Sequence, residues 1–487
     1  MSSLVEIRNN RIEKLKILRD AGVNPYPSSS RRDFSLNEVI EKYDSLLENK
    51  DIHLTGRLMS LREQGALVFF NIYDGTAKFQ GLIKKDDIGA ETFDFFQKVI
   101  DIGDFIEVGG TLFTTKRGEK TLQVTSWKML SKSLRPLPEK WHGLQDEEEK
   151  LRKRYLDILF NEDVKEIIIK REKFWASIRS FLVEKSFMEV ETPILESVPG
   201  GAEARPFITH HNALDLDIYL RISPELWLKR LMIAGFPKVF EIGRNFRNEG
   251  MDAEHLQDYS MMEFYWAYAD YNQGMELIKE LYRRVAMETF GTMKFKIKDF
   301  EIDFEKEWEI YDYVEIIKKM TDVDVTSAKL PEIEKKLREL KVEYDNKKGF
   351  NLNRAVDNLW KYCRKQIAGP GFLINVPVMM EPLAKRMEKD TNLVERFQVI
   401  LAGSEMGKGF SELNDPIDQM DRFMEQAKLL EEGDEEAQMT DGEFVEAMEY
   451  GMPPTCGFGL SERLFSFLMN KPAKECQIFP LLRPPKN

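Results

Sequence analysis

The stretch Phe240-Glu-Ile-Gly-Arg-Asn-Phe-Arg-Asn-Glu-Gly250, together with Tyr259-Ser-Met-Met-Glu-Phe-Tyr265, decides the fold of this chain. Apolar and polar residues alternate in both runs, and a charged interval separates the runs. This pattern predicts an antiparallel hairpin with the charged interval as its loop. Arg247 and Glu249 follow the first run, so we expect both at the mouth of the loop.

The hairpin carries side chains that suit a nucleotide and a charged substrate. An arginine such as Arg247 can fork onto a phosphate or a carboxylate. Glu249 can accept from an exocyclic amine, and Tyr259 offers a flat face for a base. Glu263 and Tyr265 point to one side of the second strand, because strand side chains repeat every second residue. A salt-bridged surface hairpin without a ligand is the alternative interpretation.

The hairpin resembles motif 2 of class II aminoacyl-tRNA synthetases, and two other segments narrow the resemblance to the bacterial type of the lysyl-tRNA synthetase family. Residues 199–225 are similar to the stretch that precedes motif 2 in that family. Gly409-Phe-Ser-Glu-Leu-Asn-Asp415 resembles its lysine-binding signature. The resemblance extends from about residue 52 to Arg483. It implies an α+β multidomain fold, in which an N-terminal OB-fold β-barrel precedes a catalytic domain built on an antiparallel sheet flanked by helices.

Local patterns give the expected domain boundaries. Short β-rich runs between Ile52 and Leu130, with turns at Asp74-Gly75 and at residues 116–119, predict a small barrel. A β-sandwich fragment without a ligand is the alternative for this region. The expected parts are an N-terminal helical segment (1–48), the OB-fold anticodon-binding domain (49–133), a linker (134–160) and the class II catalytic domain (161–487), with a helical insertion around 306–370. We expect no chemistry from the insertion.

A helical pattern over residues 163–185 precedes residues 187–195, which read as a strand that closes at Pro193. The pair resembles motif 1, the dimer-interface helix and strand of the family, and this resemblance implies a homodimer. A plain edge strand would accommodate the proline equally well.

The resemblance implies a set of ATP-binding residues. Activation of an amino acid brings a carboxylate onto the α-phosphate of ATP, so the enzyme must position two anions and neutralise their charge. By resemblance, Arg247 bridges the α-phosphate and the amino-acid carboxylate, and Arg463 of motif 3 lies on the other face of the adenine; these two are the catalytic candidates. The remaining ATP candidates are Glu249 at the adenine amine, Tyr259 on the ring, His255 at the outer phosphates, and Glu405. A surface histidine is the alternative for His255.

The resemblance also implies a lysine pocket. A buried ammonium is costly unless a carboxylate pairs with it. By resemblance, Glu263 and Glu412 bind the ε-ammonium with the Tyr265 hydroxyl, whereas Glu225 and the backbone at Gly201 hold the α-ammonium. Arg247 and Phe410 complete the lysine-binding set. A structural ion pair is the alternative for any single one of these carboxylates.

Several positions depart from the family pattern. The resemblance implies Mg²⁺ as the cofactor, with Glu405 and Gln398 as candidate ligands, but the family usually has glutamate at 398 and asparagine at 408, where this chain has Lys408. Leu256 stands where the family has asparagine, and motif 3 is one residue shorter than usual. These changes leave the lysine pocket intact but leave the number of bound ions open. We expect fewer ions, with Lys408 supplying part of the positive charge; the alternative is a solvent-facing Lys408.

The barrel implies an RNA partner. Phe69 and Gln80 match the anticodon-reading residues of the family, and stacking on an aromatic ring plus amide contacts to a base edge is how single-stranded RNA is read. Core packing is the alternative for Phe69, which belongs to an apolar run. The acidic anticodon contact of the family falls near Ser126.

Composition is consistent with this reading. The chain has 487 residues, which suggests about three domains. Its net charge of −13 argues against general, sequence-independent binding of nucleic acid, and it has only 3 Cys. An odd number of cysteines fits no disulfide framework, so we expect a cytoplasmic protein. No apolar run approaches the length that a membrane span needs. The expected partners are ATP, L-lysine, tRNA(Lys) and a second copy. The rivals are an aspartyl or asparaginyl enzyme, an enzyme that lysylates a translation factor, and a non-catalytic RNA-binding relative.

Overall fold

The computed structural model describes the whole chain except residues 1–2, 139–145, 251–253, 345–349, 435–436 and 485–487. The chain divides into two compact units, Met1–Phe160 and Asn161–Asn487. Each unit has its own hydrophobic core.

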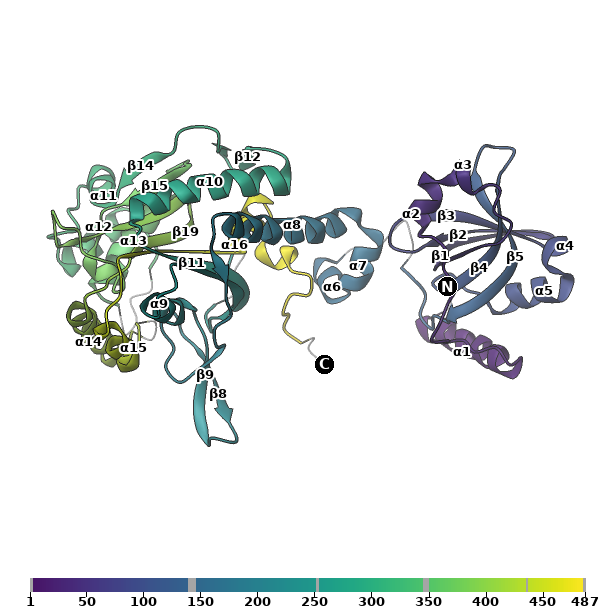
Figure 1. Cartoon of the computed structure of the whole chain (residues 1–487), viewed down its shortest axis with the longest axis horizontal. Helices are drawn as coiled ribbons and strands as arrows, with labels where there is room; N and C mark the ends of the chain where they lie inside the picture. The colour runs from purple at the N-terminus through teal and green to yellow at the C-terminus, as the bar shows by residue number, and fades with distance from the viewer. Residues whose placement is uncertain (1–2, 139–145, 251–253, 345–349, 435–436, 485–487) are drawn as a thin grey trace. The chain divides into compact units, whose positions relative to one another are not determined.

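The first unit contains a closed barrel of five strands in the order β1-β2-β3-β5-β4 (Figure 1). The strands are β1 (Ile52–Gln64), β2 (Leu67–Tyr73), β3 (Lys78–Lys84), β4 (Phe105–Thr114) and β5 (Lys120–Ser131). The barrel confirms the expected OB-fold. The helices of this unit are α1 (Leu4–Asp20), α2 (Leu36–Glu41), α3 (Tyr43–Leu46), α4 (Lys85–Ile88), α5 (Ala90–Val99), α6 (Glu147–Arg152) and α7 (Arg154–Phe160).

Alternation along β2 separates the barrel core from its outer face. Val68, Phe70 and Ile72 are buried in the core, whereas Phe69 and Asn71 are only partly buried between them. The β2–β3 turn forms at the expected place: Gly75 adopts a φ of +94°, which a side chain would disfavour, and Asp74 Oδ1 accepts from the backbone N–H of Thr76 at 2.9 Å.

The second unit is built on an eight-stranded sheet in the order β14-β15-β18-β19-β20-β11-β10-β6. Its neighbours are antiparallel except β14–β15 and β10–β6, so the expected antiparallel sheet is confirmed. Its strands are β6 (Met188–Glu189), β10 (Lys238–Phe246), β11 (Asp258–Ala267), β14 (Glu309–Asp312), β15 (Gly371–Ile374), β18 (Arg396–Leu401), β19 (Ser404–Ser411) and β20 (Thr455–Ser461). The hairpin predicted from the sequence is β10–β11.

Helices pack against the sheet, and three small sheets complete the unit. The helices are α8 (Glu162–Glu184), α9 (Glu225–Ile233), α10 (Tyr271–Phe290), α11 (Tyr313–Thr321), α12 (Leu330–Glu339), α13 (Leu352–Arg364), α14 (Pro416–Glu431), α15 (Gly442–Glu449) and α16 (Arg463–Leu468), with 3₁₀ turns at Val378–Met380 and Ala473–Cys476. The smaller sheets combine β7 (Leu195–Glu196), β8 (Phe207–His211) and β9 (Leu216–Leu220); β12 (Lys294–Ile297) and β13 (Phe300–Asp303); and β16 (Val376–Pro377) and β17 (Leu393–Val394).

The two faces of β11 have different roles. Met262 and Phe264 are buried in the core that also contains residues of α8 and α10. Glu263 and Tyr265 alternate with them and line a cavity on the other face. One strand therefore anchors the fold with one set of side chains and presents polar groups with the other set.

Two segments differ from their sequence patterns. The strand expected over 187–195 is interrupted: Met188–Glu189 pairs with β10 and Leu195 pairs with β9, whereas Pro193 lies in irregular chain between them because proline has no N–H for a ladder. The 306–370 segment is not purely helical: it contains β14, a strand of the main sheet, before α11, α12 and α13.

Candidate active site

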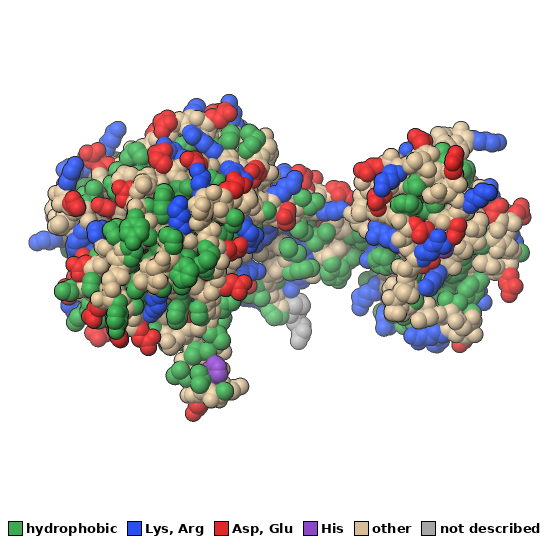
Figure 2. Space-filling view, in the orientation of Figure 1, with side chains coloured by type: hydrophobic (Ala, Val, Ile, Leu, Met, Phe, Trp, Pro, Cys, Tyr) green, Lys and Arg blue, Asp and Glu red, His purple; other side chains and the backbone are tan. Residues whose placement is uncertain are grey.

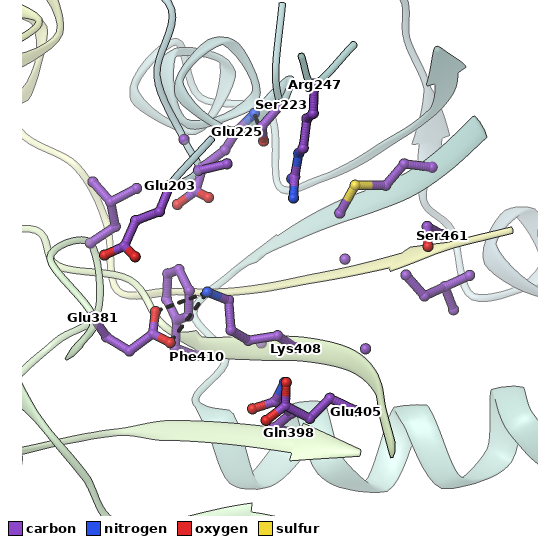
Figure 3. A pocket seen from close by; sticks show the side chains of 18 of the residues that line it. Glu203, Ser223, Glu225, Arg247, Glu381, Gln398, Glu405, Lys408, Phe410 and Ser461 are labelled. Atoms are coloured by element: carbon purple, nitrogen blue, oxygen red, sulfur yellow. Dashed lines mark hydrogen bonds and ion pairs between the residues drawn. The ribbon is translucent and has the colours of Figure 1, made fainter. Parts of the chain in front are cut away.

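A cavity of about 450 Å³ opens on the Glu263 face of the sheet (Figure 3). Residues from β11, β19, β20 and the start of α9 line it. The structure brings every candidate residue of the second unit to this one cavity: Gly201, Glu225, Arg247, Glu249, His255, Tyr259, Glu263, Tyr265, Gln398, Glu405, Phe410, Glu412 and Arg463.

Three carboxylates are buried together in the cavity wall. Glu225, Glu263 and Glu412 are 7%, 3% and 1% exposed. Ser223 Oγ donates to Glu263 Oε1 at 2.8 Å, and the Tyr265 hydroxyl donates to Glu263 Oε2 at 3.2 Å. Among the described residues, Glu412 Oε1 has no hydrogen-bond partner. The cluster therefore offers acceptor atoms that a bound cation can satisfy.

Protons are held tightly in this cluster. Burial, followed by the neighbouring Glu225 carboxylate, raises the pKa of Glu263 to about 8. Burial also raises the pKa of Glu412 well above its ordinary value, although the ammonium of Lys229 opposes the shift. The pKa of the Tyr265 phenol is raised for the same reason, first by burial and then by Glu225, so Tyr265 stays a hydrogen-bond donor.

Two glycines make room for these side chains. A Cβ at Gly457 would overlap Glu412 Oε1 and would lie 2.6 Å from Tyr265 Cε1. A Cβ at Gly201 would lie 2.7 Å from Glu225 Cβ, and Gly201 has a φ of +81°, a region that favours glycine. The shape of the carboxylate end therefore depends on glycine at both positions.

Arg247 reaches into the cavity from the residue after β10 (Figure 3). Its backbone N–H donates to the carbonyl oxygen of Gln257 at 2.8 Å, which continues the hairpin beyond the last ladder pair. Its guanidinium lies 5.6 Å from the centre of the Tyr259 ring. A cationic fork beside an aromatic face suits a nucleotide phosphate next to its base.

Glu405 lines the cavity away from the carboxylate cluster, and a hydrogen bond and nearby arginines stabilise its charged form. Trp360 Nε1 donates to Glu405 Oε1 at 2.5 Å. Burial alone would raise the pKa of Glu405, but Arg364, Arg396, the Trp360 hydrogen bond and Arg463 together hold the pKa below its ordinary value. Glu405 is therefore ionised, and it lines the cavity as a candidate ligand for a cation.

Gln398, the second candidate metal ligand, already accepts a hydrogen bond from a neighbouring arginine. Its amide oxygen, the atom that could bind a metal ion, accepts from Arg396 Nη2. Among the described residues, no group of three or more His, Cys, Asp or Glu side chains is arranged to hold a metal ion. The donor set thus fits an ion that shares Glu405 with phosphate oxygens, since Mg²⁺ is commonly held by one or two carboxylates plus substrate phosphates.

Lys408 points into the cavity and contacts a buried carboxylate (Figure 3). Its Nζ lies 3.1 Å and 3.2 Å from the two carboxylate oxygens of Glu381. Glu381 also forms an ion pair with Arg396 Nε at 2.8 Å. Because Arg396 already balances Glu381, Lys408 can turn toward an anion without leaving that carboxylate uncompensated.

Arg463 begins α16 and closes the same end of the cavity. Its Nη1 donates to the backbone carbonyl of Glu405 at 3.1 Å, and its Nε donates to Glu254 Oε2 at 3.2 Å. Glu249 and His255 line the cavity beside it. Residues 251–253 between them lie outside the described part of the chain.

The two barrel candidates share the outer face of the barrel. Phe69 lies outside the barrel core, and the guanidinium of Arg62 lies 5.3 Å from its ring centre. Gln80 pairs with Asn71 across β2 and β3, and its Nε2 donates to Thr121 Oγ1 at 2.8 Å. The hydrogen bond to the Thr121 hydroxyl therefore fixes the orientation of the Gln80 amide group.

Sequence reasoning missed several residues that shape the site. Ser223 and Lys229 hold the carboxylate cluster, and Trp360 comes from the segment for which no chemistry was expected. The spacing of Glu225 and Lys229, four apart on one helix, could have indicated their pairing. The burial of that pair and the long-range contact of Trp360 with Glu405 carry no local signal.

Comparisons with known proteins agree on one family. A family profile described as "tRNA synthetases class II (D, K and N)" matches residues 146–483, and one described as "OB-fold nucleic acid binding domain" matches residues 52–130. The chain is 45% identical to the lysine–tRNA ligase of Thermotoga maritima, over 99% of this chain and 97% of that protein. It is 43% identical to the ligase of Pelotomaculum thermopropionicum (99% and 96%) and 41% identical to that of Carboxydothermus hydrogenoformans (99% and 99%).

Proposed function

This chain belongs to the class II lysine–tRNA ligases, and from that premise we propose how its cavity activates L-lysine with ATP and passes it to tRNA(Lys). A lysine carboxylate oxygen attacks the α-phosphorus of ATP, the bond to the β-phosphate breaks, and pyrophosphate leaves. A ribose hydroxyl at the 3′ end of the tRNA then attacks the lysyl carbonyl, and AMP leaves. The observation that carries the proposal is the buried cluster of Glu225, Glu263 and Glu412.

The carboxylate cluster binds the two ammonium groups of lysine. Glu263, Glu412 and the Tyr265 hydroxyl receive the ε-ammonium, because Glu412 Oε1 has no hydrogen-bond partner among the described residues and Tyr265 already orients Glu263. Glu225 and the backbone at Gly201 receive the α-ammonium. Phe410 supports the aliphatic stem from β19.

The arginine end binds ATP. Arg247 bridges the α-phosphate and the lysine carboxylate, so that two anions meet across one cation. Tyr259 stacks on the adenine, with Glu249 at its amine and Arg463 on the opposite face. His255 contacts the outer phosphates. Catalysis then rests on positioning and charge neutralisation, and the reaction needs no general base.

The phosphates also need charge from an ion and from Lys408. Glu405 is the protein group that fits Mg²⁺, which would neutralise phosphate charge when bound with ATP. Gln398 contributes less, because Arg396 occupies its amide oxygen. Lys408 turns from Glu381 toward the phosphates and replaces part of the charge that a further ion would bring.

The barrel reads the anticodon. Phe69 stacks a base on the outer face of β2, and Gln80 contacts a base edge with its amide oxygen. The position of Phe69 outside the barrel core and the nearby cation Arg62 support this role.

The chain acts as a homodimer in the cytoplasm. Exposed apolar side chains occur on β6, on β7 and on the β8–β9 ribbon, and Figure 2 shows apolar side chains on the projection that this ribbon forms. The residues are Met188, Leu195, Ile208, Leu214 and Leu216. Three free, buried cysteines agree with a reducing compartment. No described helix is long and apolar enough to cross a membrane.

The rival substrates fail on charge. An aspartate side chain would add an anion to three buried carboxylates, and an asparagine side chain would leave them without a cation. The chain also keeps the barrel, which argues against a factor-modifying enzyme. The ionised Glu405 and the complete carboxylate cluster argue against a non-catalytic relative.

Amino-acid-dependent exchange of pyrophosphate into ATP, measured across the common amino acids, tests the proposal. We expect L-lysine alone to stimulate exchange strongly. Glu412→Gln should weaken lysine activation by orders of magnitude and leave the KM for ATP nearly unchanged, since breaking a buried charge pair costs about 3–5 kcal/mol. Glu449→Gln, an exposed glutamate on α15, is the control. Stimulation by aspartate, or full lysine activation by Glu412→Gln, would refute the assignment.

A further inference from the structure

A lysine of the chain itself lies against the proposed lysine pocket. Lys229 is fully buried, one helical turn after Glu225 on α9. Its Nζ lies 2.8 Å from Glu225 Oε1 and also forms an ion pair with Glu412 Oε2. The Phe410 and Phe444 rings lie 5.4 Å and 6.0 Å from the ammonium, so it has a largely apolar surround on its other sides.

This ammonium fixes the charge of the pocket. The three carboxylates Glu225, Glu263 and Glu412 face one resident cation, so two negative charges remain in excess when all three are ionised. L-Lysine brings two ammonium groups, and Arg247 balances its carboxylate. With lysine bound, the charges of these groups sum to zero, which matters because an uncompensated buried charge is costly.

We propose that Lys229 is a specificity-determining positioning residue. Its charge leaves the pocket with an excess of two negative charges, which two substrate ammonium groups balance, and its ion pair holds Glu412 with Oε1 toward the substrate. The inference rests on the proposed function. Lys229 acts through Glu225 and Glu412 and does not itself touch lysine. Amino acids of similar length with one ammonium, such as methionine, leave one charge unbalanced.

The empty pocket relieves its excess charge by holding protons. Glu263 faces Glu225 from α9, Ser223, Arg247, Tyr259 and its own neighbour Tyr265. Glu412 faces Lys229, Glu225, Glu263, Tyr265 and Cys456. The pKa of Glu263, raised first by burial and then by Glu225, is about 8. Lysine must displace this proton, so its kcat/KM rises with pH and levels off above that pKa.

The charge of Lys229 determines where that inflection falls. Removal of a cation raises the pKa of neighbouring carboxylates, because their charged forms lose a stabilising partner. Lys229→Met preserves length but removes the charge, so the pocket holds protons to higher pH. A side chain that only fills space would change lysine affinity without moving the inflection.

The test is the pH profile of lysine kcat/KM in the exchange assay for wild type, Lys229→Met, Glu412→Gln and the double variant Lys229→Met with Glu412→Gln. We expect the inflection to move up by at least one pH unit in Lys229→Met, which is a tenfold loss at any pH below it. It should move down in Glu412→Gln, and return toward wild type in the double variant, where two charges are again in excess. The titration of free lysine is common to all four and cancels.

The KM for ATP and the melting temperature control for folding. If Lys229→Met does not fold, the inflection of the double variant must still lie above that of Glu412→Gln, and equal inflections in these two variants would overturn the role of Lys229. An inflection that stays in place in Lys229→Met, or a double variant that is shifted no less than Lys229→Met, would overturn the role of Lys229. Failure of wild type to activate lysine would instead refute the proposed function.

Discussion

Gly457→Ala probes the lysine pocket through a single methyl group. The added Cβ would overlap Glu412 Oε1 and lie 2.6 Å and 3.0 Å from Tyr265 Cε1 and Cδ1. Both neighbours are buried, at 1% and 3% exposure, so neither can swing into solvent. Overpacking of this kind costs about 1–3 kcal/mol. Because about 1.4 kcal/mol is a factor of ten, lysine kcat/KM should fall about 5- to 150-fold.

The loss should be confined to lysine. The methyl group displaces the ε-ammonium ligands and leaves Arg247 and Tyr259 in place, so the KM for ATP should change less than about twofold. Gly442→Ala is the matched control: its Cβ would meet nothing within 4 Å, and alanine favours helix α15, where Gly442 is the first residue. Lysine kcat/KM within twofold of wild type in Gly457→Ala, or equal losses for lysine and ATP, would refute the assignment of this end of the cavity.

Three further predictions concern the other parts of the molecule. Phe69→Ala should raise the KM for tRNA while adenylate formation is unchanged, because stacking is worth about 1–3 kcal/mol per base. Leu47→Ala, at an exposed apolar residue of the same unit, is the control. Loss of both steps together with a lower melting temperature would mean that Phe69 is structural. Trp360→Phe removes the hydrogen-bond donor to Glu405 and should raise the KM for ATP about tenfold or more, because hydrogen bonds to charged groups are worth about 1.5–3 kcal/mol. The KM for lysine, which should not change, is the internal reference. Gln398→Glu combined with Lys408→Asn should increase the Mg²⁺ dependence of exchange, and superimposable Mg²⁺ titrations of the two proteins would contradict the role given to Lys408.

The parts of the site that follow a local period were predictable from the sequence. The alternation in Tyr259–Tyr265 gave the hairpin and the common direction of Glu263 and Tyr265, and the β10–β11 ladder bears out the hairpin. Phe69 was ambiguous in an apolar run, and only the alternation of burial along β2 separates it from the core. The helical pattern over 163–185 corresponds to α8, which spans Glu162–Glu184.

The parts that depend on distant contacts were not predictable. Trp360 reaches Glu405 across forty-odd residues of sequence, and Lys408 on β19 contacts Glu381 from a separate segment of the chain. The strand expected before Pro193 is only two residues long, since pairing partners rather than propensity decide strand length. Desolvation explains the rest: a glutamate reads the same in sequence whether it is exposed or buried.

The division of β11 into a core face and a cavity face constrains how this site can change. A shift of one residue in the pairing of β11 with β10 or β20 would exchange every inward and outward side chain. Phe264 would then enter the substrate cavity, and the Glu263 carboxylate would enter the hydrophobic core. Insertions or deletions within the strand therefore destroy recognition and folding together. New substrate preferences in this scaffold must come from replacing side chains in a fixed register.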